Sequence, residues 1–548
     1  MEVGAGYGFA MTQADYVIVG AGSAGCAVAR RLAESGASVI LIEAGRPDDK
    51  GLAKMLIQLP GSVNVMLSTP QLKKIFDWGY KSVPQENALN REIPQFRGRV
   101  LGGSSSVNGM IFVRGNKKNF DDWEADGCEG WGYEGVLPYF KRMEDFEGGA
   151  SEVRGVGGPI KVEVKKVLTP ATQIFLDGCA ANGVKLNDDY NGVEQEGVAI
   201  IQQSVSKGLR YSSAQGYIHD KSLPNLAVVV DTHVKKVVIE KGRATGVETV
   251  DKDGNVEVIK ADNEIVLSGG VIGSAQILML SGVGHADHLK QHGITCLSDL
   301  PVGDNLHDHL FVPMSYRMDE ALHKAKPSYF IRGLAEEMRR KDGSTWAGSS
   351  SFETTGFVRT SHAQAIPDLQ IFSLHWAYPK PNQDDPSKRV KPPTKKPGYS
   401  VFPTLIYPKS RGTLRLGSAD PAAAPLFDPA YLKEKEDTEV LVEGIGMMRD
   451  IMRSVAAAGG EIPDGPEIWD DATLRKELPN YVHTVYHPVG TCRMGNDERA
   501  VVDSKLRVRG VEGLRVADAS VMPSVTGGNT NAPSIMIGDK AADLILWG

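Results

Sequence analysis

The sequence has few cysteines, and this excludes two kinds of stabilising site. The five are Cys26, Cys128, Cys179, Cys296 and Cys492, and no two of them form a Cys-x-x-Cys pair. An odd number of widely spaced cysteines argues against a disulfide framework or a zinc site and fits a reducing compartment. We therefore expect a cytoplasmic protein that binds no metal.

Basic residues are not in excess either. The chain has 61 Lys and Arg against 68 Asp and Glu, a formal net charge of −7, and it has no long basic run. Nucleic acid is therefore not an expected partner, since binding to a phosphate backbone needs a concentrated positive surface.

A long hydrophobic run is also missing. Residues 1–11 are rich in glycine and lack a basic start followed by an apolar stretch, so no secretion signal is predicted. Residues 265–284 carry no charge but hold five glycines and three serines, unlike the continuous apolar stretch of a spanning helix. We interpret them as a buried strand, a glycine turn and a short helix over residues 274–281. No transmembrane segment is expected, and peripheral membrane association is left open.

A dinucleotide-binding pattern stands near the N-terminus. The apolar run Tyr16-Val17-Ile18-Val19 predicts a buried parallel strand, and Gly20-Ala21-Gly22-Ser23-Ala24-Gly25 follows it at once. In such a turn Gly20 allows the tight bend and Gly22 lets backbone N–H groups approach a pyrophosphate. Gly25 lets the following helix, expected over residues 23–35, pack closely on the strand.

A second predicted strand, residues 38–42, ends at Glu43. A carboxylate at this place can accept both ribose hydroxyls and would repel a 2′-phosphate, which disfavours NADP. In this strand–turn–helix–strand–acid context the glycine motif predicts a dinucleotide site, but it does not separate FAD from NAD.

A second cluster of small residues lies at positions 97–110, Arg97-Gly98-Arg99-Val100-Leu101-Gly102-Gly103-Ser104-Ser105-Ser106-Val107-Asn108-Gly109-Met110. It is too rich in glycine and serine for the interior of a helix or strand. Backbone amides in such a segment can face a flat or anionic ligand. The apolar runs around it, with Arg114, favour a buried loop over a flexible surface loop.

Together these motifs resemble the glucose–methanol–choline oxidoreductase family. The resemblance rests on residues 20–25 with Glu43, 97–110, 269–284, Pro301-Val302-Gly303-Asp304-Asn305-Leu306, and His487 with Asn531, and it runs from about Asp15 to the end of the chain. It implies an α/β fold, in which a Rossmann-like FAD-binding domain is interleaved with an α+β substrate domain containing an antiparallel sheet. The FAD-binding domain is expected over 12–60, 91–160, 205–310 and 481–548, and the substrate domain over 61–90, 161–204 and 311–480.

The resemblance also implies which residues hold FAD. Some members attach the cofactor through a histidine of the second glycine cluster, and the matching residue here is Val107, so non-covalent FAD is expected. Asn108 to Ile111 should line the flavin ring, Val234 should meet the adenine, and Asp518 with Ala519 should lie by the ribityl–phosphate part. The full expected set is Gly20, Gly22, Ser23, Ala24, Gly25, Glu43, Ala44, Trp78, Arg97, Val100, Gly103, Asn108, Gly109, Met110, Ile111, Val234, Tyr486, Asp518, Ala519 and Thr530.

Two residues near the C-terminus suit the chemistry of alcohol oxidation. The carbinol C–H must face the flavin N5, the hydroxyl proton needs an acceptor, and the developing alkoxide needs a donor. His487, in Val-Tyr-His-Pro-Val-Gly, suits the base, and Asn531, in Gly-Gly-Asn-Thr-Asn-Ala-Pro, suits the donor at the start of a helix expected over 532–546. His483 has the weaker claim, because the family motif places the base just before Pro-Val-Gly.

The substrate side is less sharply marked. Phe352-Glu353-Thr354 and residues 368–376 alternate as strands do. Candidate pocket residues are Phe352, Glu353, His375, Trp376 and Tyr378, although ordinary sheet packing explains each equally well. The proline- and lysine-rich residues 379–398 are either a lid or an irregular excursion.

We therefore predict FAD-dependent oxidation of a primary alcohol, aliphatic or polyether-like, to an aldehyde. Choline is the alternative, because Glu353 and Trp376 could attract a cation, and an aryl or furanic alcohol could stack on the same aromatic residues. The acceptor of the electrons is expected to be a quinone or dye, with oxygen as the other choice. A fatty-acid photodecarboxylase, which resembles the family in fold, is disfavoured because His487 is present and residues 404–408 hold no cysteine.

Overall fold

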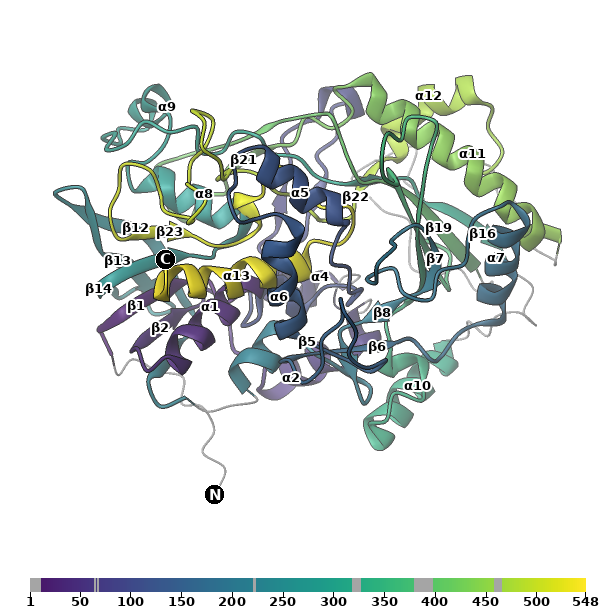
Figure 1. The fold of residues 1–548 in the computed structure, drawn as a ribbon, viewed down its shortest axis with the longest axis horizontal. Coiled ribbons are helices and arrows are strands. Elements are labelled where there is room, and N and C mark those ends of the chain that lie inside the picture. Colours follow the sequence, from purple (N-terminus) through teal and green to yellow (C-terminus); the bar gives the residue numbers. More distant parts are fainter. Residues whose placement is uncertain are drawn as a thin grey trace.

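A computed structural model of the chain describes residues 11–63, 66, 69–219, 223–317, 327–378, 398–457 and 466–548. Residues 379–397 of the proline-rich segment lie outside this part. Within it no helix is long and apolar enough to cross a membrane. Figure 1 shows two large sheets side by side, each with its own helices, and the chain passes between them more than once.

The first sheet is mixed and has the order β11–β2–β1–β14–β13–β12, with β23 also paired to β14. Because β1 lies parallel to β2 and β14, its apolar residues are buried on both faces, as the sequence predicted. Its strands are β1 (Gln13–Val19), β2 (Val39–Ile42), β11 (Leu226–Val229), β12 (Thr232–Glu240), β13 (Arg243–Asp251), β14 (Val256–Leu267) and β23 (Leu514–Val516).

Helices α1 (Ser23–Glu34), α8 (Gly270–Leu280) and α13 (Asn531–Leu546) accompany this sheet. The α1 and α13 helices touch closely, since a Cβ atom on Gly538 would lie 2.3 Å from the Ala24 carbonyl oxygen. The strand, turn and helix predicted over residues 265–284 are confirmed as the end of β14 followed by α8.

The second sheet is antiparallel, with the order β22–β15–β19–β18–β17–β7 and with β16 paired to β19. Its back face is covered by α7 (Pro170–Ala181) and α11 (Lys435–Ala457), and its inner face carries a separate aromatic cluster. Its strands are β7 (Gly197–Ile200), β15 (Leu310–Phe311), β16 (Met314–Arg317), β17 (Phe352–Val358), β18 (Leu369–Leu374), β19 (Gly398–Leu405) and β22 (His483–Thr484).

The predicted fold class, a Rossmann-like unit with an antiparallel substrate sheet, is confirmed. One detail differs: β22 lies within 481–548, which was assigned to the FAD-binding domain, yet it pairs with β15 of the second sheet. The remaining helices are α2 (Gly51–Gln58), α4 (Pro70–Phe76), α5 (Lys117–Ala125), α6 (Tyr133–Met143), α9 (Ala286–Gln291), α10 (Pro327–Arg340) and α12 (Asp471–Tyr481).

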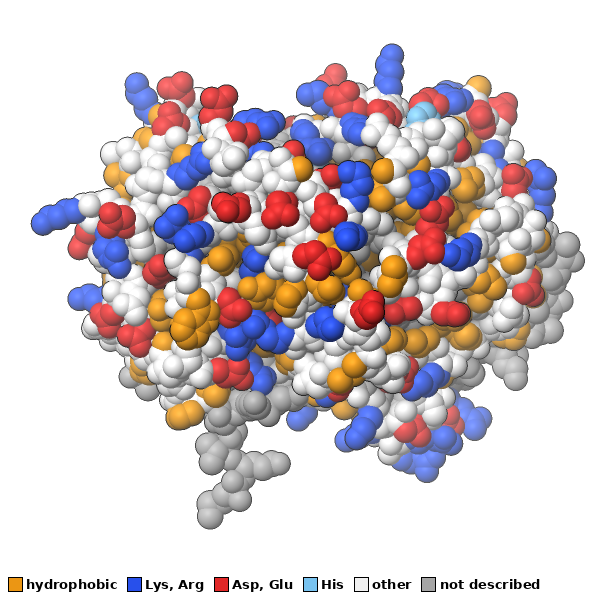
Figure 2. All heavy atoms as spheres, in the orientation of Figure 1, with side chains coloured by type: hydrophobic (Ala, Val, Ile, Leu, Met, Phe, Trp, Pro, Cys, Tyr) orange, Lys and Arg blue, Asp and Glu red, His pale blue; other side chains and the backbone are white. Residues whose placement is uncertain are grey.

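Short strands complete the structure: β3 (Tyr80–Lys81) with β4 (Pro94–Gln95), β5 (Glu144–Phe146) with β6 (Ile160–Val164) and β8 (Gln202–Gln203), β9 (Val205–Ser206) with β10 (Leu209–Arg210), and β20 (Thr413–Arg415) with β21 (Leu426–Asp428). On the face drawn in Figure 2, acidic and basic side chains are interspersed.

Candidate active site

The first glycine motif forms a cradle at the start of α1. Gly20 adopts a φ of +97°, and a Cβ atom on Gly25 would lie 1.9 Å from the Gly20 carbonyl oxygen, so the turn requires glycine at both places. A Cβ atom on Gly22 would meet no atom within 4 Å. The N-terminus of α1 therefore faces open space, which fits a pyrophosphate group.

The second glycine cluster lies against this cradle. The Gly102 N–H donates to the Ala21 carbonyl at 2.8 Å. A Cβ atom on Gly103 would lie 2.8 Å from the Gly22 Cα atom. Two motifs about eighty residues apart therefore form one surface, as a shared ligand would require.

Glu43 is buried beside the first cradle. Its carboxylate accepts the Ala21 N–H at 3.1 Å and the Gly45 N–H at 2.8 Å, one on each oxygen. Burial raises the pKa of Glu43 to about 7, against the opposing effect of these hydrogen bonds. Each oxygen keeps a lone pair that a ribose hydroxyl could use.

Other residues expected around FAD lie along the same edge of the first sheet. Asp518 accepts the Gly270 N–H at 2.8 Å and the Ser274 hydroxyl at 2.6 Å, which joins the motif after β14 to the C-terminal motif. Trp78 stacks on Tyr80 and lies 5.7 Å, ring to ring, from His233, the neighbour of Val234 on β12.

The remaining residues expected to hold FAD lie in or next to the two glycine segments and the C-terminal loops. Arg97 donates to the Tyr486 carbonyl, which links the second glycine cluster to the residue before His487. Met110 has a φ of +63° and its carbonyl accepts the Ser204 N–H. Ser23, Ala24, Ala44, Val100, Asn108, Gly109, Ile111, Ala519 and Thr530 belong to the two glycine segments, the end of β2 and the loops before α13.

Arg210 is a cofactor candidate that the sequence did not reveal. Its guanidinium donates to the carbonyls of Ile57 and Ser105 and, at 2.8 Å, to the Asn108 side chain, and its remaining nitrogen, Nη2, is buried without a partner among the described residues. Burial lowers the pKa of Arg210 to about 9. A buried cation with a free donor beside the second glycine cluster fits an electron-rich ligand such as FAD.

His487 is buried where the two sheets meet. Its Nε2 atom lies 3.2 Å from Asn529 Nδ2, and its Nδ1 atom lies 3.1 Å from His309 Nδ1. The two imidazole rings are perpendicular, with centroids 5.3 Å apart. The His487 backbone N–H donates to Asp308 at 2.8 Å, so the strand-end residues Asp308 and His309 hold both the backbone and the ring.

The partner of His487 is therefore Asn529, not Asn531 as the sequence suggested. The Asn531 side-chain oxygen accepts the Ser23 hydroxyl at 2.7 Å, at the start of α1. In an Asn-Thr-Asn loop, sequence alone does not show which asparagine turns towards the base. Asn531 begins α13, so its side chain is directed to the neighbouring helix start beside the cradle.

The surroundings of His487 keep its imidazole neutral. Burial lowers the pKa of His487 well below its usual range, and the nearby His309 and Arg97 lower it further. A neutral imidazole has a free lone pair on one nitrogen, as a proton acceptor needs.

An aromatic wall on the inner face of the second sheet lies beside this pair. Phe311 and Phe402 have ring centroids 4.7 Å apart, and Tyr378 lies 5.0 Å from Phe402. Phe352 would approach a Cβ atom on Gly109 within 3.1 Å, so the wall reaches the second glycine cluster. The wall comprises Phe311, Phe352, Phe357, Phe372 and Phe402, with Trp376, Tyr378 and Tyr407 packed against it.

Glu353 and His375 do not belong to this wall. Glu353 accepts the Thr169 hydroxyl at 2.7 Å and a hydrogen bond from Thr172 at the start of α7, on the back face. His375 Nδ1 lies 3.5 Å from the Glu353 carboxylate. Successive residues of a strand point to opposite faces, so Glu353 points away from Phe352. The pairing of β17 with β18 shifts between Phe352 and Thr354, and this bulge also puts Glu353 on the face opposite to Phe357. Of the five pocket candidates, Phe352, Trp376 and Tyr378 belong to the aromatic wall, whereas Glu353 and His375 do not.

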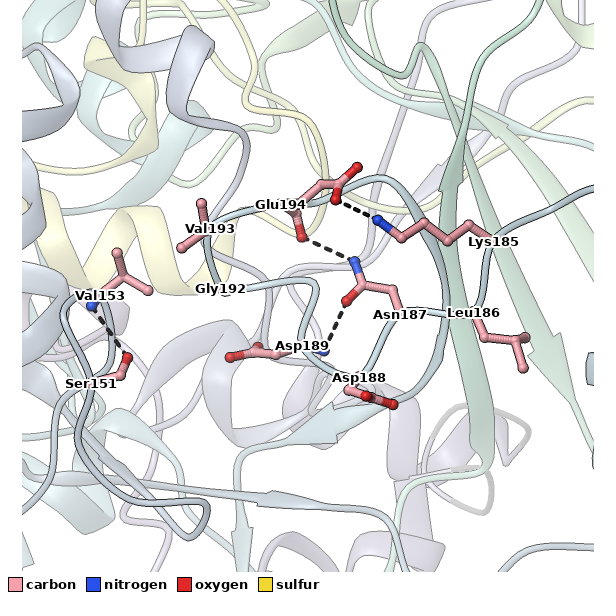
Figure 3. Close-up of a pocket in the computed structure, with 10 residues that line it drawn as sticks. All are labelled: Ser151, Val153, Lys185, Leu186, Asn187, Asp188, Asp189, Gly192, Val193 and Glu194. Atoms are coloured by element: carbon pink, nitrogen blue, oxygen red, sulfur yellow. Dashed lines mark hydrogen bonds and ion pairs between the residues drawn. The ribbon is translucent and has the colours of Figure 1, made fainter.

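A surface cleft of about 410 Å³ lies elsewhere and contains none of the expected site residues. Within it Lys185 is directed to Glu194, and the Asn187 amide donates to the Glu194 carbonyl at 3.0 Å (Figure 3). We therefore place the candidate active site at His487 and not in this cleft.

Comparisons with known proteins show the family of the chain. The two GMC oxidoreductase family models match residues 14–311 and 408–538. An oxygen-dependent choline dehydrogenase of Rhizobium johnstonii is 40% identical over 97% of this chain and 96% of its own.

Two solved structures share the fold over nearly the whole chain. A pyridoxine 4-oxidase from Mesorbium loti has a TM-score of 0.84 at 28% identity and covers 96% of this chain and 98% of its own. A formate oxidase variant of Aspergillus oryzae, studied for its effect on FAD modification, has a TM-score of 0.88 at 27% identity and covers 97% and 98%.

The orphan donor of Arg210 leads to a first prediction. Replacing Arg210 by Met removes a buried cation and its free N–H, so FAD should bind roughly ten to a hundred times more weakly, a loss of about 1.4–2.8 kcal/mol. The measurement is a titration of the apoprotein with FAD, followed by flavin fluorescence. Unchanged affinity would show that Arg210 does not contact the cofactor.

Proposed function

Because the chain belongs to the glucose–methanol–choline oxidoreductase family and its cofactor is FAD, we propose that it oxidises a primary alcohol to an aldehyde at His487 and Asn529. The observation that carries the proposal is the neutral, buried imidazole of His487 with an amide donor 3.2 Å from its Nε2 atom.

Each group has a definite task in this reaction. Bound FAD supplies the acceptor for the hydride that leaves the carbinol carbon. His487 Nε2 accepts the hydroxyl proton. The Asn529 amide has two N–H bonds, one directed to His487 and a second that can stabilise the developing alkoxide. A substrate hydroxyl would take the place of this N–H donor at His487 Nε2.

We further propose an alcohol with an uncharged, aliphatic or polyether-like tail. The tail would pack on the aromatic wall, where apolar surface is removed from water. Glu353, the carboxylate expected to attract a cation, lies on the back face with Thr169 and Thr172.

Choline is the second candidate, and the comparisons favour it. The curated relatives with 38–40% identity are named oxygen-dependent choline dehydrogenases. Aromatic faces alone can also hold a quaternary ammonium group, by cation–π attraction.

We propose that FAD is bound without a covalent link, since the Val107 side chain offers no nucleophile. For reoxidation we propose a quinone or dye, because the C-terminal residues 529–543 are similar to those of bacterial choline- and alkanol-dehydrogenase-like members of the family. Oxygen is the alternative that the relatives' names support.

A pair of asparagine variants tests the assignment of the donor. Asn529→Ala should slow flavin reduction about a hundredfold with little change in FAD affinity, as expected when a donor to an oxyanion is removed. Asn531→Ala should instead weaken FAD binding, because Asn531 contacts the start of α1. Anaerobic stopped-flow absorbance gives the rates. The reverse pattern would return the donor role to Asn531.

A pair of isosteric alcohols tests the substrate. Choline and 3,3-dimethylbutan-1-ol have the same shape and differ in the charge of one atom. An uncharged pocket should give the neutral alcohol the higher kcat/KM, by about tenfold or more, because it loses less hydration on binding. A preference for choline of that size would establish the second candidate and refute our choice.

A further inference from the structure

Gln370 is a buried polar residue on the inner face of β18 and carries no role so far. Its Nε2 atom donates to the Thr355 hydroxyl at 3.0 Å and to Asn529 Oδ1 at 3.4 Å. We propose that Gln370 is a positioning residue that orients the Asn529 amide and thereby keeps His487 in the tautomer that can accept a proton. This rests on the proposed function, in which His487 is the base.

The orientation of the Asn529 amide decides which nitrogen of His487 is free. An amide has a donor end, NH₂, and an acceptor end, C=O. With Oδ1 held by Gln370, the NH₂ group faces His487 Nε2, which must then carry a lone pair. The proton of the neutral ring is left on Nδ1.

The proton on Nδ1 has a partner on the other side. His487 Nδ1 lies 3.1 Å from His309 Nδ1, so His487 donates and His309 accepts. His309 then carries its own proton on Nε2. That atom is buried and has no hydrogen-bond partner within the described residues.

The contact of Gln370 Nε2 with Asn529 Oδ1 sets the direction of the chain of hydrogen bonds, and the backbone carbonyls of Ile406 and Thr526 act on the pKa of His309. Burial lowers the pKa of His309 to about 3, and the two carbonyls oppose this lowering. A carbonyl can only accept, so it favours a protonated nitrogen towards it. The order then runs from Gln370 through Asn529 to His487, and from His487 to His309.

Reversing the Asn529 amide would disable the base. Oδ1 would then face His487 Nε2, which would have to carry the proton, and the lone pair would move to the far side of the ring. The NH₂ groups of Asn529 and Gln370 would also face each other. Mismatched buried donors of this kind cost about 1–3 kcal/mol each, so Gln370 opposes the reversal.

The charged and titratable groups around His487 are few. Asp308 binds its backbone N–H, His309 contacts its ring, and Arg97 lowers its pKa from a distance. The loop that carries Asn529 contributes no charge from residues 524–534. The polar group through which Gln370 can act on His487 is therefore the side-chain amide of Asn529.

The experiment compares two variants of Gln370 with a control on the same strand. Gln370→Leu removes the donor, and Gln370→Glu presents only acceptors, which reverses the Asn529 amide. Ser373→Ala removes a polar group from the back face of β18. Two readouts are needed: the pH dependence of flavin reduction, and the ¹⁵N ring shifts of His487, identified by their loss in His487→Gln.

In the wild type the neutral imidazole is the active form, so flavin reduction should stay constant through neutral pH and fall only well below pH 6.5. Its ¹⁵N shifts should show the proton on Nδ1. Gln370→Leu should slow flavin reduction about tenfold, at little change in KM, and should populate the tautomer with the proton on Nε2. Gln370→Glu should populate this tautomer more strongly. It should also shift the loss of flavin reduction at acid pH to higher pH values. Ser373→Ala should match the wild type.

If His487 keeps the wild-type tautomer in both Gln370 variants, the proposal is overturned, even if flavin reduction slows. Gln370 would then act by packing alone. If Gln370→Leu does not fold with FAD, Gln370→Glu, which keeps the size of the side chain, decides. If no alcohol reduces the wild-type flavin, the proposed function fails, while the ¹⁵N shifts still test the role of Gln370.

Discussion

The contact between Asn529 and His487 joins the two halves of the molecule, and the candidate chemistry depends on it. His487 follows β22 of the substrate sheet, whereas Asn529 lies in the loop before α13 of the nucleotide-binding unit. The loop is held by close approach: a Cβ atom on Gly528 would lie 2.5 Å from Val113. Gly527 is bonded through its N–H to Asn119 and through its carbonyl to Gln195. Neither half could provide the pair alone.

Burial gives this contact its chemical effect. An imidazole removed from water loses the solvation that favours its charged form, so His487 stays neutral as the base requires. Burial also leaves the Nη2 donor of Arg210 without a partner among the described residues, beside the second glycine cluster. The two residues therefore have complementary roles. His487 can accept a proton from the substrate, and Arg210 can donate a hydrogen bond to an electron-rich group of the cofactor.

The sequence predicted the elements around the first glycine motif well, because that signal is local. Residues 16–43 hold strand, turn, helix and acid within one short stretch, and the structure has them in that order. Asn529 was missed because an Asn-Thr-Asn loop does not reveal its own orientation. Glu353 was misplaced because a bulge in β17 turns it to the back face. The proposed roles of Arg210 and Gln370 depend on contacts with residues more than a hundred positions away in the sequence. No local sequence pattern reveals such contacts.

The central claim is that His487 is the proton acceptor, and chemical rescue tests it most directly. His487→Gly leaves a cavity of imidazole size while the other groups stay in place. The FAD-loaded variant should reduce its flavin at least a hundredfold more slowly than the wild type, on the scale of a lost general base. Added imidazole should restore part of the rate, increasingly at pH values where imidazole is neutral. Flavin reduction as fast as in the wild type, without imidazole, would contradict the account.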